Sequence, residues 1–207
     1  MGPSFRCEVF SQNNMQFDTL KKALEQQGLS LKILNMAASN NWGDYVERTE
    51  DAHIDEYLNV DVSDITTALE MYNYVAFDCR VDEKRRCGVM VQKIHDTLYQ
   101  TTFSVDMDED SPFYAGDVTD ENVFVFQTAI DVLLADEKAH VLCIIMGEEL
   151  VALYQDTIEQ TVETTNYKQV VVLPKEITVQ LHDHTVFAKG DYTVYISKYS
   201  PLSKPIY

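Results

Sequence analysis

The chain has 207 residues, of which 34 are acidic and 16 basic, so its formal net charge is −18 at pH 7. A field of this sign repels phosphate backbones and anionic lipid headgroups, which argues against direct binding to nucleic acid or to a membrane. It favours a basic protein as partner, because complementary charge speeds encounter.

The composition is typical of a folded globular chain, with 45% hydrophobic residues, 12 Tyr and nine Phe. We expect a single domain over residues 1–207, with a subdivision into 1–165 and 166–207 as the alternative. No apolar stretch is long enough to cross a bilayer, and the first twenty residues lack the apolar segment of a signal peptide. The sequence therefore predicts a cytoplasmic protein.

The four cysteines, Cys7, Cys79, Cys87 and Cys143, have irregular spacing and form no CxxC motif. This pattern is typical of reduced thiols that fill a core rather than of a disulfide scaffold or a zinc site. Cys79 and Cys87 flank a predicted turn, so a disulfide between them is an alternative.

The first third of the chain predicts a strand, a helix and a second strand. Residues 5–10 alternate weakly as a strand does, and residues 17–28 place apolar side chains on one helical face. Gly28 is a typical residue after a helix end, and residues 29–33 alternate again. Residues 37–61 are polar and acidic and predict a loop.

The middle of the chain predicts further strands and a short helix. Residues 63–72 favour a short helix, residues 74–79 a buried strand, and residues 82–86 a hairpin turn. Residues 88–102 fit either helix or strand, and strand is the better fit. Residues 106–121 predict an acidic loop.

The last 90 residues predict two helices and then a run of strands. A helix is expected from Thr119, a buried strand over residues 141–146, and a second helix from Gly147 onwards. The apolar face of that second helix is expected to consist of Leu150, Tyr154, Ile158 and Val162. Four short strands are expected over residues 169–173, 176–181, 184–189 and 192–197.

These elements together predict an α+β fold with a mixed β-sheet and three to four helices, whose C-terminal part is an antiparallel β-meander.

Negative charge is concentrated in one part of the sequence. Residues 94–167 hold 16 acids and one base, a net of −15, whereas residues 168–207 hold three acids and five bases. Residues 44–64 add eight acids and one base. Because a charge that serves only solubility has no need to be segregated, this distribution favours a directed acidic face.

A D-x-D-x-D pattern over Asp106, Asp108 and Asp110 superficially resembles an EF-hand calcium loop. Ser111 stands where that loop requires Gly, and Asp117 replaces its bidentate Glu. We therefore expect a solvated or partner-binding loop and no metal.

No catalytic signature is visible. The chain lacks G-x-S-x-G, H-E-x-x-H and the glycine-rich phosphate loops, and His182 and His184 alone are too few for a zinc site. We expect no cofactor and no enzymatic activity, with a hydrolase that uses Asp, Glu and His as the alternative.

The leading hypothesis is a non-enzymatic acidic protein that neutralises or inhibits a basic protein, such as a toxin or a nucleic-acid-binding protein. Bacterial immunity proteins against nuclease-type toxins share this profile of small size, acidity and absent catalytic motifs, which is an analogy of composition only. An acidic assembly component and a nucleic-acid mimic are further alternatives. The residues expected to bind the partner are Asp44, Glu47, Asp51, Asp55, Glu56, Asp106, Asp108, Glu109, Asp110, Tyr114 and Asp117.

Overall fold

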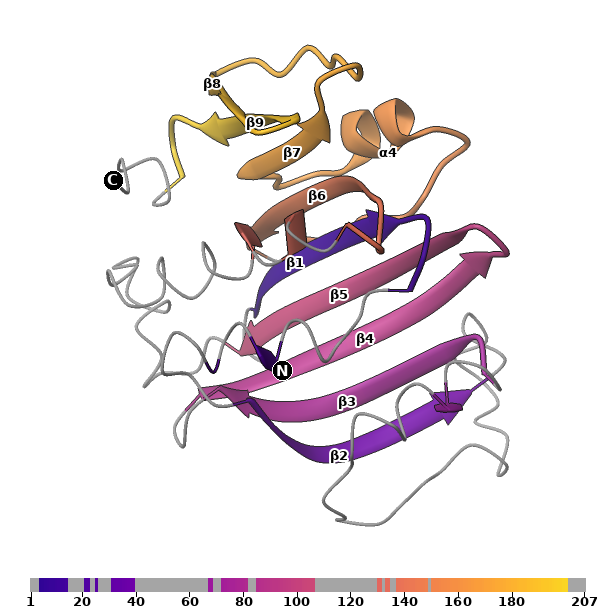
Figure 1. Ribbon diagram of the computed structural model, residues 1–207. Helices are drawn as coiled ribbons and strands as arrows, with labels where there is room; N and C mark the ends of the chain where they lie inside the picture. Colours follow the sequence, from indigo (N-terminus) through magenta and orange to yellow (C-terminus); the bar gives the residue numbers. More distant parts are fainter. Residues whose placement is uncertain are drawn as a thin grey trace.

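The computed structural model shows one large antiparallel β-sheet with a helix packed on one face (Figure 1). It describes residues 4–14, 21–22, 25, 31–39, 67–68, 72–81, 85–106, 130–131, 133–134, 137–148 and 150–200. The described elements are β1 (Ser4–Ser11), β2 (Leu31–Ser39), β3 (Tyr74–Val81), β4 (Arg85–His95), β5 (Leu98–Asp106), β6 (Val141–Glu148), α4 (Ile158–Thr164), β7 (Val170–Pro174), β8 (His184–Lys189) and β9 (Tyr192–Ser197).

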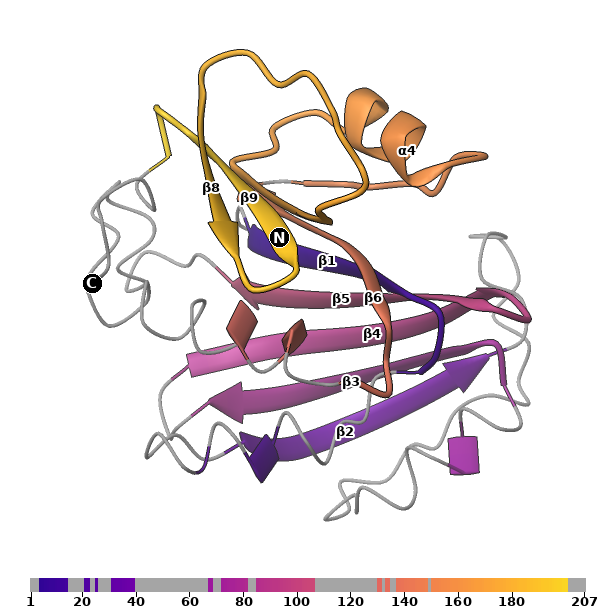
Figure 2. The same cartoon turned by 45° about the horizontal axis from the view of Figure 1, so that its top comes forward.

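The nine strands lie in the order β2-β3-β4-β5-β1-β6-β7-β9-β8. Tight hairpins join β3 to β4 and β4 to β5, and short connections of this kind force antiparallel pairing. The N-terminal strand β1 occupies the centre of the sheet, between β5 and β6. The strands rotate progressively across the sheet, so that β8 and β9 run steeply to β2–β5 in Figure 2.

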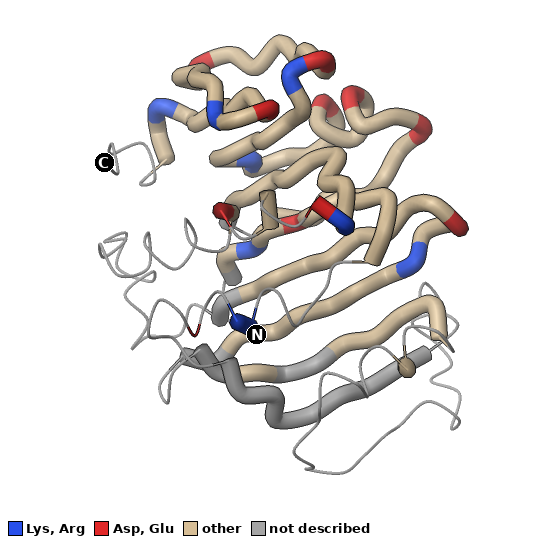
Figure 3. The backbone as a smooth tube through the Cα atoms, in the orientation of Figure 1, with Lys and Arg blue, Asp and Glu red and all other residues tan. Residues whose placement is uncertain are grey.

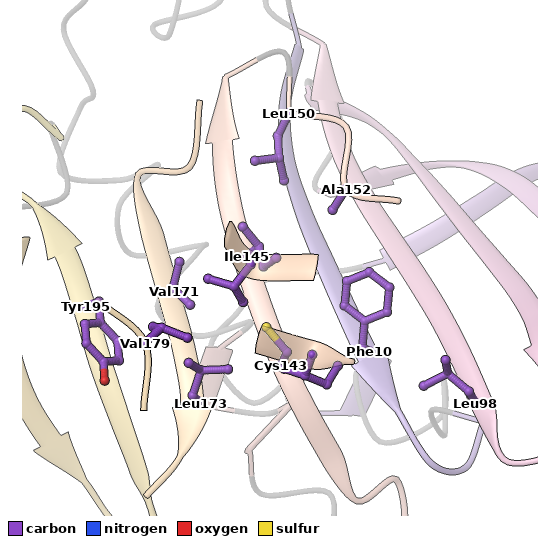
Figure 4. Close-up of a cluster of buried hydrophobic side chains, with 12 residues drawn as sticks. Phe10, Leu98, Cys143, Ile145, Leu150, Ala152, Val171, Leu173, Val179 and Tyr195 are labelled. Carbon is purple, nitrogen blue, oxygen red and sulfur yellow. The ribbon is translucent and has the colours of Figure 1, made fainter. Parts of the chain in front are cut away.

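Alternation along β1 fixes the two faces of the sheet. Phe5, Cys7 and Val9 are buried on one face, whereas Glu8 and Phe10 are buried on the other. On the Phe10 face a hydrophobic cluster fills the space beneath α4 and the chain segments before and after it (Figure 4). Its buried members are Phe10, Leu98, Cys143, Ile145, Leu150, Ala152, Ile158, Val162, Val171, Leu173, Val179 and Tyr195.

The structure corrects the fold class expected from the sequence, an α+β fold with a mixed sheet and three to four helices. Every described strand pairing is antiparallel, and α4 is the one helix whose bounds the described residues define. Helical segments interspersed with strands suggested parallel crossovers, but every neighbouring pair of described strands is antiparallel, including the pairs joined by long connections. The helices expected over residues 17–28 and 63–72 and from Thr119 lie mostly outside the described residues.

The helix expected from Gly147 is much shorter than its apolar periodicity suggested. Residues 150–156 are not helical, Thr157 is the N-cap residue, and α4 covers only Ile158–Thr164. Leu150 is buried in an extended segment, whereas Ile158 and Val162 are buried by the helix. Two different local structures thus produce the single apolar stripe that the sequence displays.

The C-terminal strands do not form the expected meander. Residues 176–181 pair with no strand, and β9 lies between β7 and β8. The alternation over 176–181 has another cause, since Ile177, Val179 and Leu181 pack against the hydrophobic cluster without joining a ladder. The sheet contains strands from both sides of the predicted division at residue 165.

Other expected strands are confirmed. Residues 5–10, 74–79, 88–102 and 141–146 fall within β1, β3, β4–β5 and β6. The residues expected to form a hairpin turn, 82–86, include the start of β4 at Arg85. All four cysteines are reduced and buried, as expected for thiols that fill a core.

Candidate binding surface

A buried carboxyl at the centre of the sheet organises the candidate site. Glu8 on β1 is 3% exposed and lies opposite Thr102 on β5 and Ile145 on β6. Its Oε2 accepts a hydrogen bond of 2.5 Å from Thr102 Oγ1 and one of 3.1 Å from Gln100 Nε2. These donors supply the partners that a buried carboxyl requires.

Burial raises the pKa of Glu8 above its usual value, because water no longer stabilises the ionised form. The hydrogen bonds from Thr102 and Gln100 and the positive charge of Arg6 lower the pKa, but they do not overcome the effect of burial. Because the carboxyl is buried and its Oε2 accepts from two donors inside the protein, Glu8 is better suited to a structural role than to acid–base catalysis.

The same polar groups hold the chain that leaves β6. Gln100 Nε2 donates a second hydrogen bond, of 2.8 Å, to the carbonyl oxygen of Ala152, and Arg6 Nη1 donates a longer one, of 3.5 Å, to that of Leu150. We call Arg6, Glu8, Gln100 and Thr102 the anchor network. This network ties residues 150–152 to the face of the sheet.

The anchored segment alternates between buried and exposed side chains. Leu150 and Ala152 are buried in the hydrophobic cluster, as Figure 4 shows. Val151 and Leu153 point the other way and are 58% and 67% exposed. An extended segment produces such alternation, so the burial of one pair fixes the exposure of the other.

Tyr154 closes the segment against the sheet. Its ring lies 6.0 Å from that of Phe10 and meets the His95 ring edge-on at 6.2 Å. Its hydroxyl donates to the carbonyl oxygen of Asp156 at 3.3 Å, which shapes the approach to α4.

A side-chain cap begins α4. Thr157 is the N-cap residue, and its Oγ1 accepts a hydrogen bond from the backbone N–H of Gln160 at 3.2 Å. Thr161 ties the turn down, because its Oγ1 donates to the carbonyl oxygen of Thr157 at 2.8 Å and accepts from the N–H of Gln155 at 2.9 Å. These contacts define where the preceding extended segment ends.

Ile158, Thr161 and Val162 bury one face of α4, and Glu159 and Glu163 remain exposed on the helix. Lys168 lies just after the helix and donates to the carbonyl oxygen of Thr165 at 2.7 Å. Partial burial lowers the pKa of Lys168, although the charge of Glu163 opposes this effect.

Exposed apolar and acidic side chains therefore occur together on one short stretch of chain. We call Val151, Leu153, Asp156, Glu159 and Glu163 the docking surface, and all five are exposed. Residues 150–167 contain these three acids and no base. Figure 3 shows the acidic positions of α4 and of the chain leading into it, without a basic position among them.

The docking surface lies within the acidic stretch 94–167, but none of its five residues is among the eleven expected to bind a partner. Ten of those eleven lie outside the described residues: Asp44, Glu47, Asp51, Asp55, Glu56, Asp108, Glu109, Asp110, Tyr114 and Asp117. The eleventh, Asp106, is the last residue of β5 and pairs with Ser4 of β1. The Thr157-x-x-Gln160 spacing, which is typical of a helix start, is the sequence signal that could have separated the segment from the helix.

Of the two metal motifs considered from the sequence, the first begins at the end of a strand and lies mostly outside the described residues, and the second lies at a turn. An EF-hand loop follows a helix, but the Asp106 motif follows strand β5. His182 and His184 flank Asp183, whose φ of 58° places it in a turn, and His184 Nδ1 lies 2.6 Å from the carbonyl oxygen of His182. Within the described residues, no group of three or more His, Cys, Asp or Glu side chains is arranged to hold a metal ion.

No protein-family model matches the chain, and no curated protein is similar to it at a significant level. Across the ranges that the structure describes, no helix combines the length and the apolar character needed to span a bilayer.

Proposed function

We propose that this protein binds and neutralises a basic protein, and that the docking surface is part of the contact. The observation that carries the proposal is the exposure of Val151 and Leu153 within residues 150–167, a stretch that also holds three exposed carboxylates and no base. Single exposed apolar side chains are common on protein surfaces, but two that alternate along one anchored segment offer a partner a continuous apolar contact.

The acidic and apolar parts have different roles. The net charge of −18 attracts a basic partner over a distance and speeds encounter. On contact, the exposed parts of Val151 and Leu153 lose water, which contributes about 1 kcal/mol for each of these already partly buried side chains. Asp156, Glu159 and Glu163 then pair with Lys or Arg at the rim and favour basic partners over acidic ones.

The anchor network supports binding because it fixes the segment before a partner arrives. A segment already held by Gln100 and by the burial of Leu150 and Ala152 loses less conformational freedom on binding. The alternation in burial also presents Val151 and Leu153 on the same side of the segment.

The more specific form of the proposal is an immunity protein that blocks a nuclease-type toxin. A nuclease carries basic groups that bind the phosphate backbone, and a strongly acidic protein is complementary to such a surface. The charge distribution along the chain supports this form, since 16 acids and one base lie between residues 94 and 167.

The test is affinity capture from cell extract with three versions of the purified protein. The docking-surface variant carries Asp156→Asn, Glu159→Gln and Glu163→Gln. The matched control carries Asp96→Asn, Glu137→Gln and Glu176→Gln, which remove three other exposed carboxylates and change the net charge equally. A further variant, Val151→Ser with Leu153→Ser, leaves the charge unchanged.

The wild type and the matched control are expected to retain one basic protein at low salt and to release it as salt rises. Both docking-surface variants are expected to capture much less of it. Equal loss of capture in the acidic variant and its matched control would show that total charge, rather than this surface, determines binding. Failure of the wild type to retain any basic protein at low salt would reject the proposed function.

A further inference from the structure

Two thiols face each other across the hairpin of β3 and β4. Cys79 and Cys87 are directly opposed in the antiparallel register, and their Sγ atoms lie 3.0 Å apart. Both side chains are buried, at 0% and 1% exposure. Only residues 80–86 separate the two cysteines in the sequence.

This placement meets the requirements of a disulfide without a change of register. Opposed residues in an antiparallel pair have Cα atoms about 4.5–5.5 Å apart, and a disulfide accepts Cα separations of about 4.4–6.8 Å. The sulfur atoms would have to approach from 3.0 Å to about 2.05 Å, which small side-chain rotations can supply.

The other two cysteines are not arranged in this way. Cys7 on β1 lies opposite Met146 of β6, and Cys143 on β6 lies opposite Phe10 of β1. Because Cys7 and Phe10 point to opposite faces of the sheet, the Cys7 and Cys143 side chains also point to opposite faces. They serve as matched internal controls, being equally buried.

We propose that Cys79 and Cys87 form an oxidation site that closes to a cross-strand disulfide in exchange with a small-molecule disulfide such as oxidised glutathione. One protein thiolate attacks a glutathione sulfur, which breaks the glutathione disulfide, releases one glutathione thiolate and leaves a mixed disulfide. The second protein thiol loses its proton and attacks the protein sulfur of that mixed disulfide, and the second glutathione leaves. The two protein thiols are oxidised by two electrons, and one oxidised glutathione becomes two reduced glutathione molecules.

The local charge favours this oxidant. Residues 79–87 contain four bases and two acids, although the whole chain carries a net charge of −18. Oxidised glutathione is an anionic peptide, so the net positive charge of the sequence between the two cysteines opposes it less than the acidic chain as a whole does.

The test measures thiol content by mass spectrometry after alkylation of the denatured protein. The reduced wild type is incubated in a buffer of reduced and oxidised glutathione, both as folded protein and during refolding from denaturant. The expected product has two alkylations instead of four and yields a peptide pair joined through Cys79 and Cys87. The refolding arm gives the oxidant access to thiols that are buried in the folded state.

Variants complete the test. Cys7→Ser with Cys143→Ser is expected to retain the linkage, and Cys79→Ser is expected to abolish it. Recovery of four alkylated thiols after refolding in the oxidising buffer would overturn the proposal, as would a disulfide that joins a different pair.

Discussion

The Glu8 carboxyl accepts hydrogen bonds from Thr102 and Gln100 inside the sheet, and burial raises its pKa. In the unfolded chain the pKa of Glu8 is near 4.5. Because the folded-state pKa is higher, the folded protein keeps the Glu8 carboxyl protonated to a higher pH than the unfolded chain does. The contribution of this group to stability is full below the unfolded pKa and is lost as the pH rises through the folded pKa.

Replacing Glu8 by Gln removes this titration. The free energy of unfolding of Glu8→Gln is expected to increase relative to the wild type as the pH rises from about 4 to about 8. The relative gain is about 1.4 kcal/mol for each unit by which the folded-state pKa is raised. Urea denaturation at a series of pH values measures it, with Glu137→Gln as an exposed control. A difference that does not change with pH would contradict the burial of an ionisable Glu8.

Gly147 on β6 lies close to the backbone of Tyr167. A Cβ atom at this position would collide with the backbone carbonyl oxygen of Tyr167, and a backbone atom cannot rotate away as a side chain can. Gly147→Ala is therefore expected to destabilise the protein by about 3 kcal/mol or more.

The matched control for this change is Gly190→Ala. Gly190 has a φ of +57° in the β8–β9 turn and open space around it, so the substitution adds backbone strain of about 1–2 kcal/mol without a collision. Thermal or urea denaturation compares the two variants. An equal cost for both would mean that β6 and Tyr167 are not packed this closely.

The role of Glu8 could not be predicted from its neighbours in the sequence. Arg6 and Glu8 alternate with Cys7 and Val9, which is the usual pattern of a strand with one solvated face. Gln100 bonds both Glu8 and the carbonyl oxygen of Ala152, and Arg6 bonds the carbonyl oxygen of Leu150, 144 positions away, so no local sequence pattern shows these contacts.

Among the elements, the boundary between the extended segment and α4 determines the docking surface. If residues 150–157 continued the helix, Val151 and Leu153 would not alternate with buried neighbours. The Thr157 cap fixes this boundary, since its side chain accepts from the backbone of Gln160.

Thr157→Ala is expected to lower the free energy of unfolding by about 1 kcal/mol, because a backbone N–H at the helix start loses its partner. Thr164→Ala is the control, as the exposed Thr164 hydroxyl only donates to carbonyl oxygens inside the helix. Its expected cost is below about 0.5 kcal/mol. If urea denaturation showed a similar loss in the free energy of unfolding for both variants, the Thr157 cap would not determine where α4 begins.

Sequence periodicity predicted several strands correctly. It failed where side chains alternate because of packing on the hydrophobic cluster rather than because of strand pairing. Residues 141–146 form a continuous apolar run in β6, where five of the six side chains are buried, so the length and character of the run identified this strand. Residues 176–181 alternate because they pack sideways on the hydrophobic cluster, and periodicity cannot distinguish this from a hydrogen-bonded strand.

For the whole molecule, the sheet order was beyond sequence reasoning. The hairpins of β3, β4 and β5 are local, but the central position of β1 depends on pairing with β5 almost 100 residues later. The total charge could be read from the sequence and indicated a basic partner. That Val151 and Leu153 are exposed, in the same stretch of chain as three exposed acids, could be learned only from the fold.

The most direct test of the binding proposal is the dissociation constant of the captured basic protein, measured as a function of salt. For the wild type it is expected to rise at least about tenfold between about 50 mM and about 500 mM salt, because screening weakens the charge pairs. At about 150 mM salt, Val151→Ser with Leu153→Ser is expected to raise it about 10- to 100-fold, as two aliphatic side chains no longer become buried. A dissociation constant that neither salt nor this variant changes would contradict the proposed role of the docking surface.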